Sequence, residues 1–243
     1  MQRRTEDRAE GQSVQGFDDV LDLMIHELRN PIAVVKGFAS TFANNIEKMS
    51  PDQLVAGSRA MLRAADKLDS LLRTFADVRS LDTESIALHR TDVLLSRLVD
   101  ETVLEQTLIV EDHTLELTIE DDVLLNVDEV RVRQILTNLI TNAVKYSPRG
   151  TPIEIVASRD GEAVHICVRD HGDGIPASRT EDVFDKFSRI SDDVSGTGIG
   201  LYISRGFARA HGGDLLLSDA GREGCTFTIV LPIHEAGSDD KPR

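Results

Sequence analysis

The chain has 243 residues, of which 40% are hydrophobic and 28% are charged, and its formal net charge at pH 7 is −15. This composition is typical of a globular protein with one large domain or two small ones. The negative charge argues against nucleic acid and anionic membrane surfaces as partners. No stretch is long and apolar enough to span a bilayer, and residues 1–10 are too polar for a signal peptide. We therefore expect a cytoplasmic protein, or the cytoplasmic part of a larger one.

A long amphipathic helix is predicted near the N-terminus. Residues 1–16 carry no apolar period and are expected to form a polar tail or linker. The first helix should run from about residue 17 to residue 45. Its apolar stripe, which requires a partner surface, consists of Leu21, Ile25, Leu28, Ile32, Val35 and Phe42.

His26 is the first candidate reactive group. It lies about 100° round the helix from Ile25, at the edge of the apolar stripe, where another macromolecule can reach it. Asn30 is one turn further on the same face, and Glu27 is adjacent in the chain. Pro31 cannot donate to the carbonyl of Glu27, so the helix should bend or loosen there. An imidazole beside a carboxylate and an amide could be a reaction centre, although a lone helix histidine is more often ordinary surface.

A second helix follows a break in the pattern. Ser50, Pro51 and Gln53 form a capping-box sequence with proline at the first helical position. The apolar residues of this helix have heptad-like spacing and are Leu54, Met61, Ala65, Leu68, Leu72 and Phe75. The two helices should form an antiparallel hairpin over residues 17–84. Because one pair cannot cover both stripes, we predict a homodimer with a four-helix bundle.

From Ile86 to residue 233 the pattern changes to strands and helices, which predicts helices packed on one face of a mixed sheet. Strands are expected at 88–89, 114–119, 123–127, 153–158, 163–169, 214–217 and 226–231. Helices are expected from a cap at 91–92 to residue 109, from a cap at Asp128 to residue 145, and near 198–211. The two cysteines, Cys167 and Cys225, are interpreted as buried thiols. Residues 234–243 are expected to be a disordered tail.

Three segments of this second domain carry candidate ligand-binding groups. Asn138, Asn142 and Lys145 fall on one side of a predicted helix, where an amide oxygen suits Mg²⁺ and a lysine suits phosphate. The commoner fate of such a pattern is a solvated helix surface.

The segment 170–176 follows a strand directly. Its alternate glycines allow close backbone approach, and Asp170 can accept a hydrogen bond from an amino group. Residues 196–201 open a helix, where glycine-rich backbone supplies N–H donors for phosphate. Neither segment is a Walker P-loop or a dinucleotide fingerprint. Between them, residues 180–195 have the composition of a lid, anchored by Phe184 and Phe187.

These motifs together resemble those of the sensor histidine kinases of two-component systems. His26-Glu27-Leu28-Arg29-Asn30-Pro31 is similar to the phosphoacceptor box, and Asn138 to Tyr146 to the N box. Asp170 to Ile175 resembles the first glycine box, Phe184 to Phe187 the phenylalanine box, and Gly196 to Leu201 the second glycine box. Five motifs in the family's order cover nearly the whole chain.

The resemblance implies a dimerisation and phosphotransfer hairpin followed by an α/β-sandwich ATP-binding domain of the Bergerat type. Asn142 would bind Mg²⁺, and Arg189 would meet phosphates and take part in catalysis. The nucleotide-binding residues implied are Asn138, Asn142, Lys145, Tyr146, Asp170, Gly172, Gly174, Ile175, Gly196, Thr197, Gly198, Gly200, Leu201 and Thr226.

The implied activity is autophosphorylation of His26 by ATP, with Glu27 as general base, followed by transfer to an aspartate of a response regulator. Asn30 would orient water for a phosphatase activity, although many members have threonine at this position. Two alternatives remain. One is an ATPase or ATP-gated clamp of the same superfamily that forms no phosphohistidine. The other is a degenerate dimeric scaffold, against which the intact Asn142 and Asp170 speak.

Overall fold

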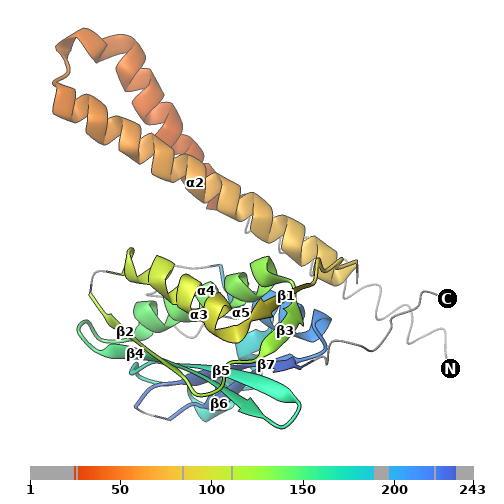
Figure 1. Cartoon of the computed structure of the whole chain (residues 1–243). Helices are drawn as coiled ribbons and strands as arrows, with labels where there is room; N and C mark the ends of the chain where they lie inside the picture. Colours follow the sequence, from red (N-terminus) through yellow and green to blue (C-terminus); the bar gives the residue numbers. More distant parts are fainter. Residues whose placement is uncertain are drawn as a thin grey trace. The chain divides into compact units, whose positions relative to one another are not determined.

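The computed structural model describes residues 25, 27–83, 85–110, 112–188, 197–221 and 223–233. The chain divides into two compact units, Met1–Ser85 and Ile86–Arg243, and each is described by itself (Figure 1). The predicted N-terminal and C-terminal tails and His26 lie outside the described residues.

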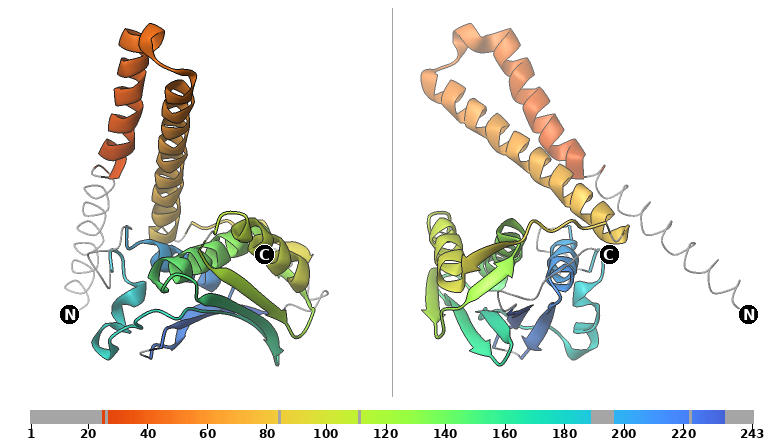
Figure 2. Two further views of the ribbon diagram at one scale, coloured as in Figure 1. Left: turned by 90° about the vertical axis from the view of Figure 1, so that its left-hand side faces the viewer. Right: turned by 45° about the vertical axis from the view of Figure 1, so that its right-hand side comes forward.

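The first unit is a helical hairpin (Figure 2). Helical residues 27–45 continue without interruption through Pro31 and are followed by the 3₁₀ helix η1 (Ile46–Lys48). The helix α2 (Pro51–Asp82) runs back in the opposite direction. Its capping box is formed as predicted: the Ser50 N–H donates to Gln53 Oε1 over 2.9 Å, and the Gln53 N–H donates to Ser50 Oγ over 3.2 Å.

The two helices approach closely at Gly57. A Cβ atom there would lie 2.5 Å from Cζ of Phe42 and 2.9 Å from Cδ1 of Phe38, so a larger residue would require these rings to move. The buried apolar positions of α2 recur every seven residues and are Gly57, Ala64, Leu71 and Val78. They alternate with the half-buried Leu54, Met61, Leu68 and Phe75, which completes a heptad pattern.

Two members of the predicted α2 stripe remain exposed in the single chain. Ala65 is exposed, and the side chain of Leu72 is 59% exposed. Val55 and Leu62 of the same helix are also exposed, at 50% and 63%. One hairpin therefore leaves part of the apolar surface of α2 uncovered.

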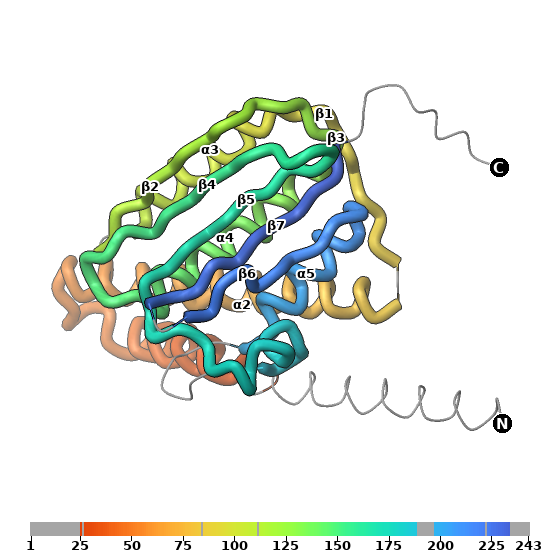
Figure 3. Tube along the Cα trace, turned by 90° about the horizontal axis from the view of Figure 1, so that it is seen from below, coloured from red at the N-terminus to blue at the C-terminus, as the bar shows by residue number. Residues whose placement is uncertain are grey.

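In the described part of the second unit, α-helices cover one face of a five-stranded sheet, as Figures 1 and 3 show. The helices are α3 (Leu95–Thr107), α4 (Glu129–Tyr146) and α5 (Gly200–Ala210). The strands are β1 (Thr91–Leu94), β2 (Thr114–Ile119), β3 (Leu124–Val127), β4 (Pro152–Asp160), β5 (Ala163–Arg169), β6 (Asp214–Asp219) and β7 (Thr226–Pro232). The sheet has the order β2-β4-β5-β7-β6, with β2 parallel to β4 and the other pairs antiparallel. This arrangement confirms the predicted fold class.

The beginning of this unit differs from the prediction. Residues 86–90 form no strand, and residues 91–94, predicted as the start of a helix, form β1, which pairs with β3. The helix α3 begins only at Leu95. Its first turn is capped by a distant side chain, because Asp122 Oδ1 accepts from the Ser96 N–H over 3.0 Å. Neither long-range contact leaves a local signal in the sequence.

Asp128 caps α4 as predicted, and the structure adds a buried histidine to this junction. Asp128 Oδ1 accepts from the Arg131 N–H, and its Oδ2 accepts from the His89 N–H. The Asp128 N–H donates to Nε2 of His211 over 3.0 Å, so the proton of that ring is on Nδ1, 2.7 Å from the Phe207 carbonyl oxygen. Burial lowers the pKa of His211. The contacts join the N-terminus of α4 to the C-terminus of α5.

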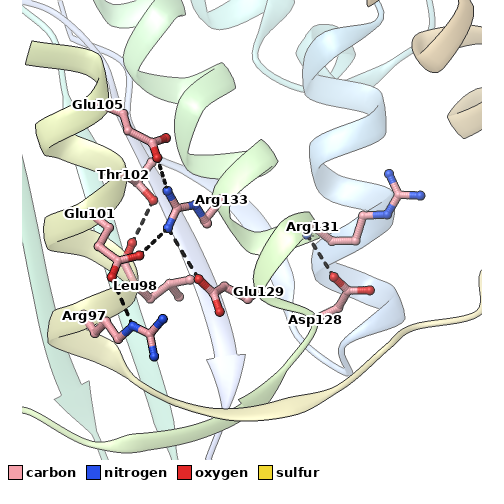
Figure 4. A network of polar contacts seen from close by, with 9 residues as sticks. All are labelled: Arg97, Leu98, Glu101, Thr102, Glu105, Asp128, Glu129, Arg131 and Arg133. Atoms are coloured by element: carbon pink, nitrogen blue, oxygen red, sulfur yellow. Dashed lines mark hydrogen bonds and ion pairs between the residues drawn. The ribbon is translucent and has the colours of Figure 1, made fainter. Parts of the chain in front are cut away.

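The solvent side of the helical layer is held by ion pairs (Figure 4). Arg133 of α4 lies 2.8 Å from Glu101 and 2.5 Å from Glu105, both on α3, and 3.4 Å from Glu129. Hydrogen bonds from Arg97 and Arg133 lower the pKa of Glu101. Apolar packing lies on the other side of α4, where Val132, Ile135, Leu136, Leu139 and Ile140 are at most 2% exposed.

Candidate functional site

Asp170 is a buried carboxylate at the end of β5 with one oxygen held by the backbone. Oδ1 accepts from the Gly172 N–H over 2.9 Å and from the Cys225 N–H over 3.2 Å. The residue is only 7% exposed, and burial raises the pKa of Asp170, although these two donors oppose the shift. Within the described part of the chain, Oδ2 accepts no hydrogen bond. This oxygen is therefore available to a donor on a ligand.

The glycines around Asp170 are required by close backbone contacts. A Cβ at Gly172 would lie 2.6 Å from the carbonyl oxygen of Tyr146, at the end of α4. Gly174 has φ +74°, and a Cβ there would lie 1.8 Å from the carbonyl oxygen of Gly221. The predicted close approach of backbone at the first glycine box is thus found, and it brings the box against the C-terminus of α4 and the loop before β7.

A second group of predicted residues lies where α4 meets α5. A Cβ at Gly200 would lie 2.4 Å from Oδ1 of Asn138, and the Asn138 Nδ2 donates to Ser204 Oγ over 2.9 Å. The amide of Asn138 is therefore turned toward α5. Asn142, one turn further along α4, is half-buried, and its amide has no hydrogen-bond partner among the described residues.

Lys145 and Tyr146 end the predicted N box. The Lys145 Nζ lies 3.4 Å from the Tyr146 hydroxyl and 4.9 Å from the centre of its ring. The cation therefore rests on the half-exposed aromatic ring, at the end of α4 that faces Gly172. Both side chains can leave this arrangement for a ligand, because the contact is at the surface.

The phenylalanine box is anchored, and it meets the second glycine box. Phe184, in the 3₁₀ helix η3 (Asp182–Phe184), is buried and packs edge-on against Phe227 with ring centres 6.2 Å apart. Phe187 has a positive φ of 65°, and a Cβ at Gly198 would lie 2.7 Å from its carbonyl carbon. The predicted Arg189 and Gly196 lie outside the described residues.

Other predicted residues are placed as follows. Ile175 is buried, Thr197 and Leu201 are half-buried, and Thr226 begins β7 opposite Arg169. Glu27 and Asn30 belong to the first unit, where Asn30 is exposed. The described residues contain no cluster of His, Cys, Asp or Glu that could hold a metal ion by itself. In the same part of the chain, no helix combines the length and apolarity needed to cross a membrane.

Two residues of this region, Ser204 and Cys225, are not among the predicted site residues. Ser204 is 2% exposed and orients Asn138, whereas Cys225 is hydrogen-bonded to Asp170 through both backbone groups. Burial and the nearby carboxylates of Asp170 and Asp219 raise the pKa of Cys225 to about 12, so the thiol stays protonated. The position of Cys225 directly after a glycine was the available signal, but the residue was interpreted only as a buried thiol.

Comparison with known proteins supports the pattern of motifs. Residues 127–235 match the family of histidine kinase-, DNA gyrase B- and HSP90-like ATPases. The chain is 28% identical over 222 residues to the sensor protein KdpD of Clostridium acetobutylicum, covering 88% of this chain and 24% of that protein. It is 27% identical over 226 residues to the sensor histidine kinase WalK of Bacillus subtilis, covering 88% and 36%.

Residues 127–235 thus match an ATPase family that includes histidine kinases, and the chain is similar to sensor histidine kinases over most of its length. The predicted resemblance is thereby confirmed, although the chain spans only 24% and 36% of the length of these two curated sensor histidine kinases. The crystal structure of full-length ShkA in complex with AMPPNP has a TM-score of 0.64 at 25% identity, covering 91% of this chain and 47% of that one. The histidine kinase ThkA in complex with the response regulator TrrA has a TM-score of 0.65 at 21% identity, covering 96% and 66%, and supports the fold.

Proposed function

We propose that this chain transfers the γ-phosphoryl group of ATP to His26 and then to an aspartate of a response regulator. Residues 17–84 would be the dimerisation and phosphotransfer hairpin, and residues 86–233 the ATP-binding domain. The observation that carries this proposal is Asp170, whose buried carboxylate has one oxygen held by two backbone N–H groups and the other available. Similarity to sensor histidine kinases supports the rest.

ATP fits the described residues at both ends of the site. Asp170 Oδ2 would accept from the adenine amino group, with Tyr146 and Thr226 beside the base. Gly198 and Gly200 stand at the N-terminus of α5, where backbone N–H groups and the helix dipole favour phosphate. Lys145, which rests on the ring of Tyr146, would meet phosphate after leaving that ring.

Transfer to His26 follows from ordinary imidazole chemistry. The unperturbed pKa of histidine is about 6.5, so at cytoplasmic pH the ring is mostly neutral and nucleophilic. One ring nitrogen would attack the γ-phosphorus, so that an N–P bond forms while the P–O bond to ADP breaks. Glu27 would take the proton from the other ring nitrogen. Arg189 would stabilise the charge on the transferring group.

Asn142 is the proposed Mg²⁺ ligand, because its amide oxygen is a hard donor without a protein partner in the described structure. When bound, Mg²⁺ neutralises charge on the phosphates. We expect Asn142→Ala to lower autophosphorylation on the order of 100-fold, measured with γ-labelled ATP. The exposed Thr141→Ala on the same helix is the control and should retain full activity. An unimpaired Asn142 variant would remove this residue from the site.

The hairpin has apolar surface left for a second copy. On α2, Val55, Leu62 and Leu72 are at least 50% exposed, and on the first helix Ile25 and Ile32 are each 42% exposed. Burying these side chains between two hairpins would give a four-helix bundle. We expect light scattering to give twice the chain mass, and the double substitution L62E/L72E to give a monomer. The control Lys67→Glu should remain dimeric, and a monomeric wild type would rule out the bundle.

The response regulator and the phosphatase reaction are the remaining parts of the proposal. ThkA was solved with a response regulator, which supports the same class of partner here. Asn30 is exposed one turn beyond His26, where its amide could orient water against the phosphorylated regulator. We expect Asn30→Ala to keep autophosphorylation but to slow regulator dephosphorylation about tenfold. Equal dephosphorylation rates for the variant and the wild type would reject this role.

A further inference from the structure

The side chain of His171 ties the turn after β5 to the neighbouring strand. His171 follows Asp170 directly, and its Nε2 lies 2.9 Å from Oε1 of Glu154 on β4. Its backbone N–H donates to Oγ of Ser147, the residue that ends α4, over 3.2 Å. His171 therefore joins three elements that border the candidate adenine end of the site.

The register of the sheet explains this contact. Glu154 pairs directly with Arg169, the last residue of β5, and His171 lies two residues beyond the end of that strand, so the register places the turn beside Glu154. The charged groups that contact or adjoin His171 are therefore Glu154, at 2.9 Å, and Asp170, its neighbour in the chain. His171 is therefore held both by its side chain, through Glu154, and by its backbone N–H, through Ser147.

The contact between His171 and Glu154 matters because the rest of the turn contains glycines, whose backbone can adopt many conformations. Gly172 and Gly174 follow within three residues, and Gly174 has a positive φ. The backbone donors to Asp170 fix only Oδ1, and they come from this turn and from the loop before β7. A rotation of the turn would redirect Oδ2, the oxygen available to a ligand.

We propose that His171 is a positioning residue that, through Glu154, holds the Asp170 carboxylate in the orientation that reads the adenine amino group. This inference rests on the proposed nucleotide function. The His171 and Glu154 side chains are 28% and 36% exposed, and a polar contact at such exposure contributes little to global stability. The effect of losing the pair should therefore appear in adenine recognition and leave the unfolding temperature unchanged.

The test compares two ligands on the full chain by calorimetry: ADP, and purine riboside diphosphate, which lacks the amino group. We expect His171→Ala and Glu154→Ala each to weaken ADP binding about tenfold and to leave the analogue's affinity unchanged. The double variant should be no weaker than either single one. Glu154→Gln keeps an acceptor oxygen and should remain within about twofold of wild type.

The control is His165→Ala, a half-buried histidine on the same face of β5, which should leave both affinities unchanged. Equal losses for ADP and the analogue, or additive losses in the double variant, would overturn the assignment of His171 alone. Single variants that bind ADP as tightly as the wild type would also overturn the assignment of His171. A wild type that fails to prefer ADP over the analogue would overturn the proposed adenine site and this inference together.

Discussion

Replacing His26 by Gln is expected to abolish formation of the phosphoprotein while leaving ADP affinity unchanged. Glutamine has no ring nitrogen to attack phosphorus, whereas the nucleotide groups proposed here all belong to the second unit. The measurement is incubation with γ-labelled ATP, followed by separation of labelled protein, beside calorimetric titration with ADP. The loss should be complete, because no other group on the hairpin is proposed to take the phosphoryl group.

The matched control for this variant is His89→Gln. The side chain of His89 is exposed, and its backbone N–H, which donates to Asp128, survives the substitution. This control should be labelled like the wild type. Label that survives in the His26 variant would assign the acceptor to another residue.

Replacing Asp170 by Asn is expected to lower ADP affinity on the order of 100-fold. Asn offers one acceptor oxygen and one NH₂ group, whereas the site needs two acceptor oxygens, because Oδ1 already takes the N–H groups of Gly172 and Cys225. Either amide orientation places donor against donor, at the backbone or at the adenine amino group. Isothermal titration with ADP measures the change.

Asp173→Asn is the control for this second substitution, because Asp173 is an exposed carboxylate in the same turn. It should bind ADP like the wild type. Thermal unfolding of both variants separates loss of binding from loss of fold. If Asp170→Asn keeps its affinity for ADP, the adenine amino group is read elsewhere.

Features specified by neighbouring residues could be predicted from the sequence. The Ser50 capping box, the Asp128 cap and the alternating strand at 163–169 each depend on a few adjacent residues and appear where predicted. The predicted start of α3 was wrong because β1 pairs with β3 and because Asp122 caps the helix from a distant loop. The burial of Ala65 and Leu72 is not specified within one hairpin, where both are exposed.

In the candidate site, too, local features could be predicted from the sequence, whereas long-range contacts could not. Glycine spacing predicted close backbone approach at residues 172 and 174, but only the tertiary fold supplies the opposing carbonyls of Tyr146 and Gly221. The contact of Asn138 with Ser204, 66 residues away in the chain, likewise depends on the tertiary fold. Residues that could bind a ligand can thus be identified from the sequence, whereas their hydrogen-bond partners depend on packing between distant segments.

The most direct test of the central claim is to incubate the wild-type chain with γ-labelled ATP and Mg²⁺ and to follow both protein-bound label and released phosphate. We expect label that is lost in acid, retained in alkali and mapped to His26. Steady hydrolysis of ATP with no label on the protein would contradict the account and indicate a hydrolase with a helical stem.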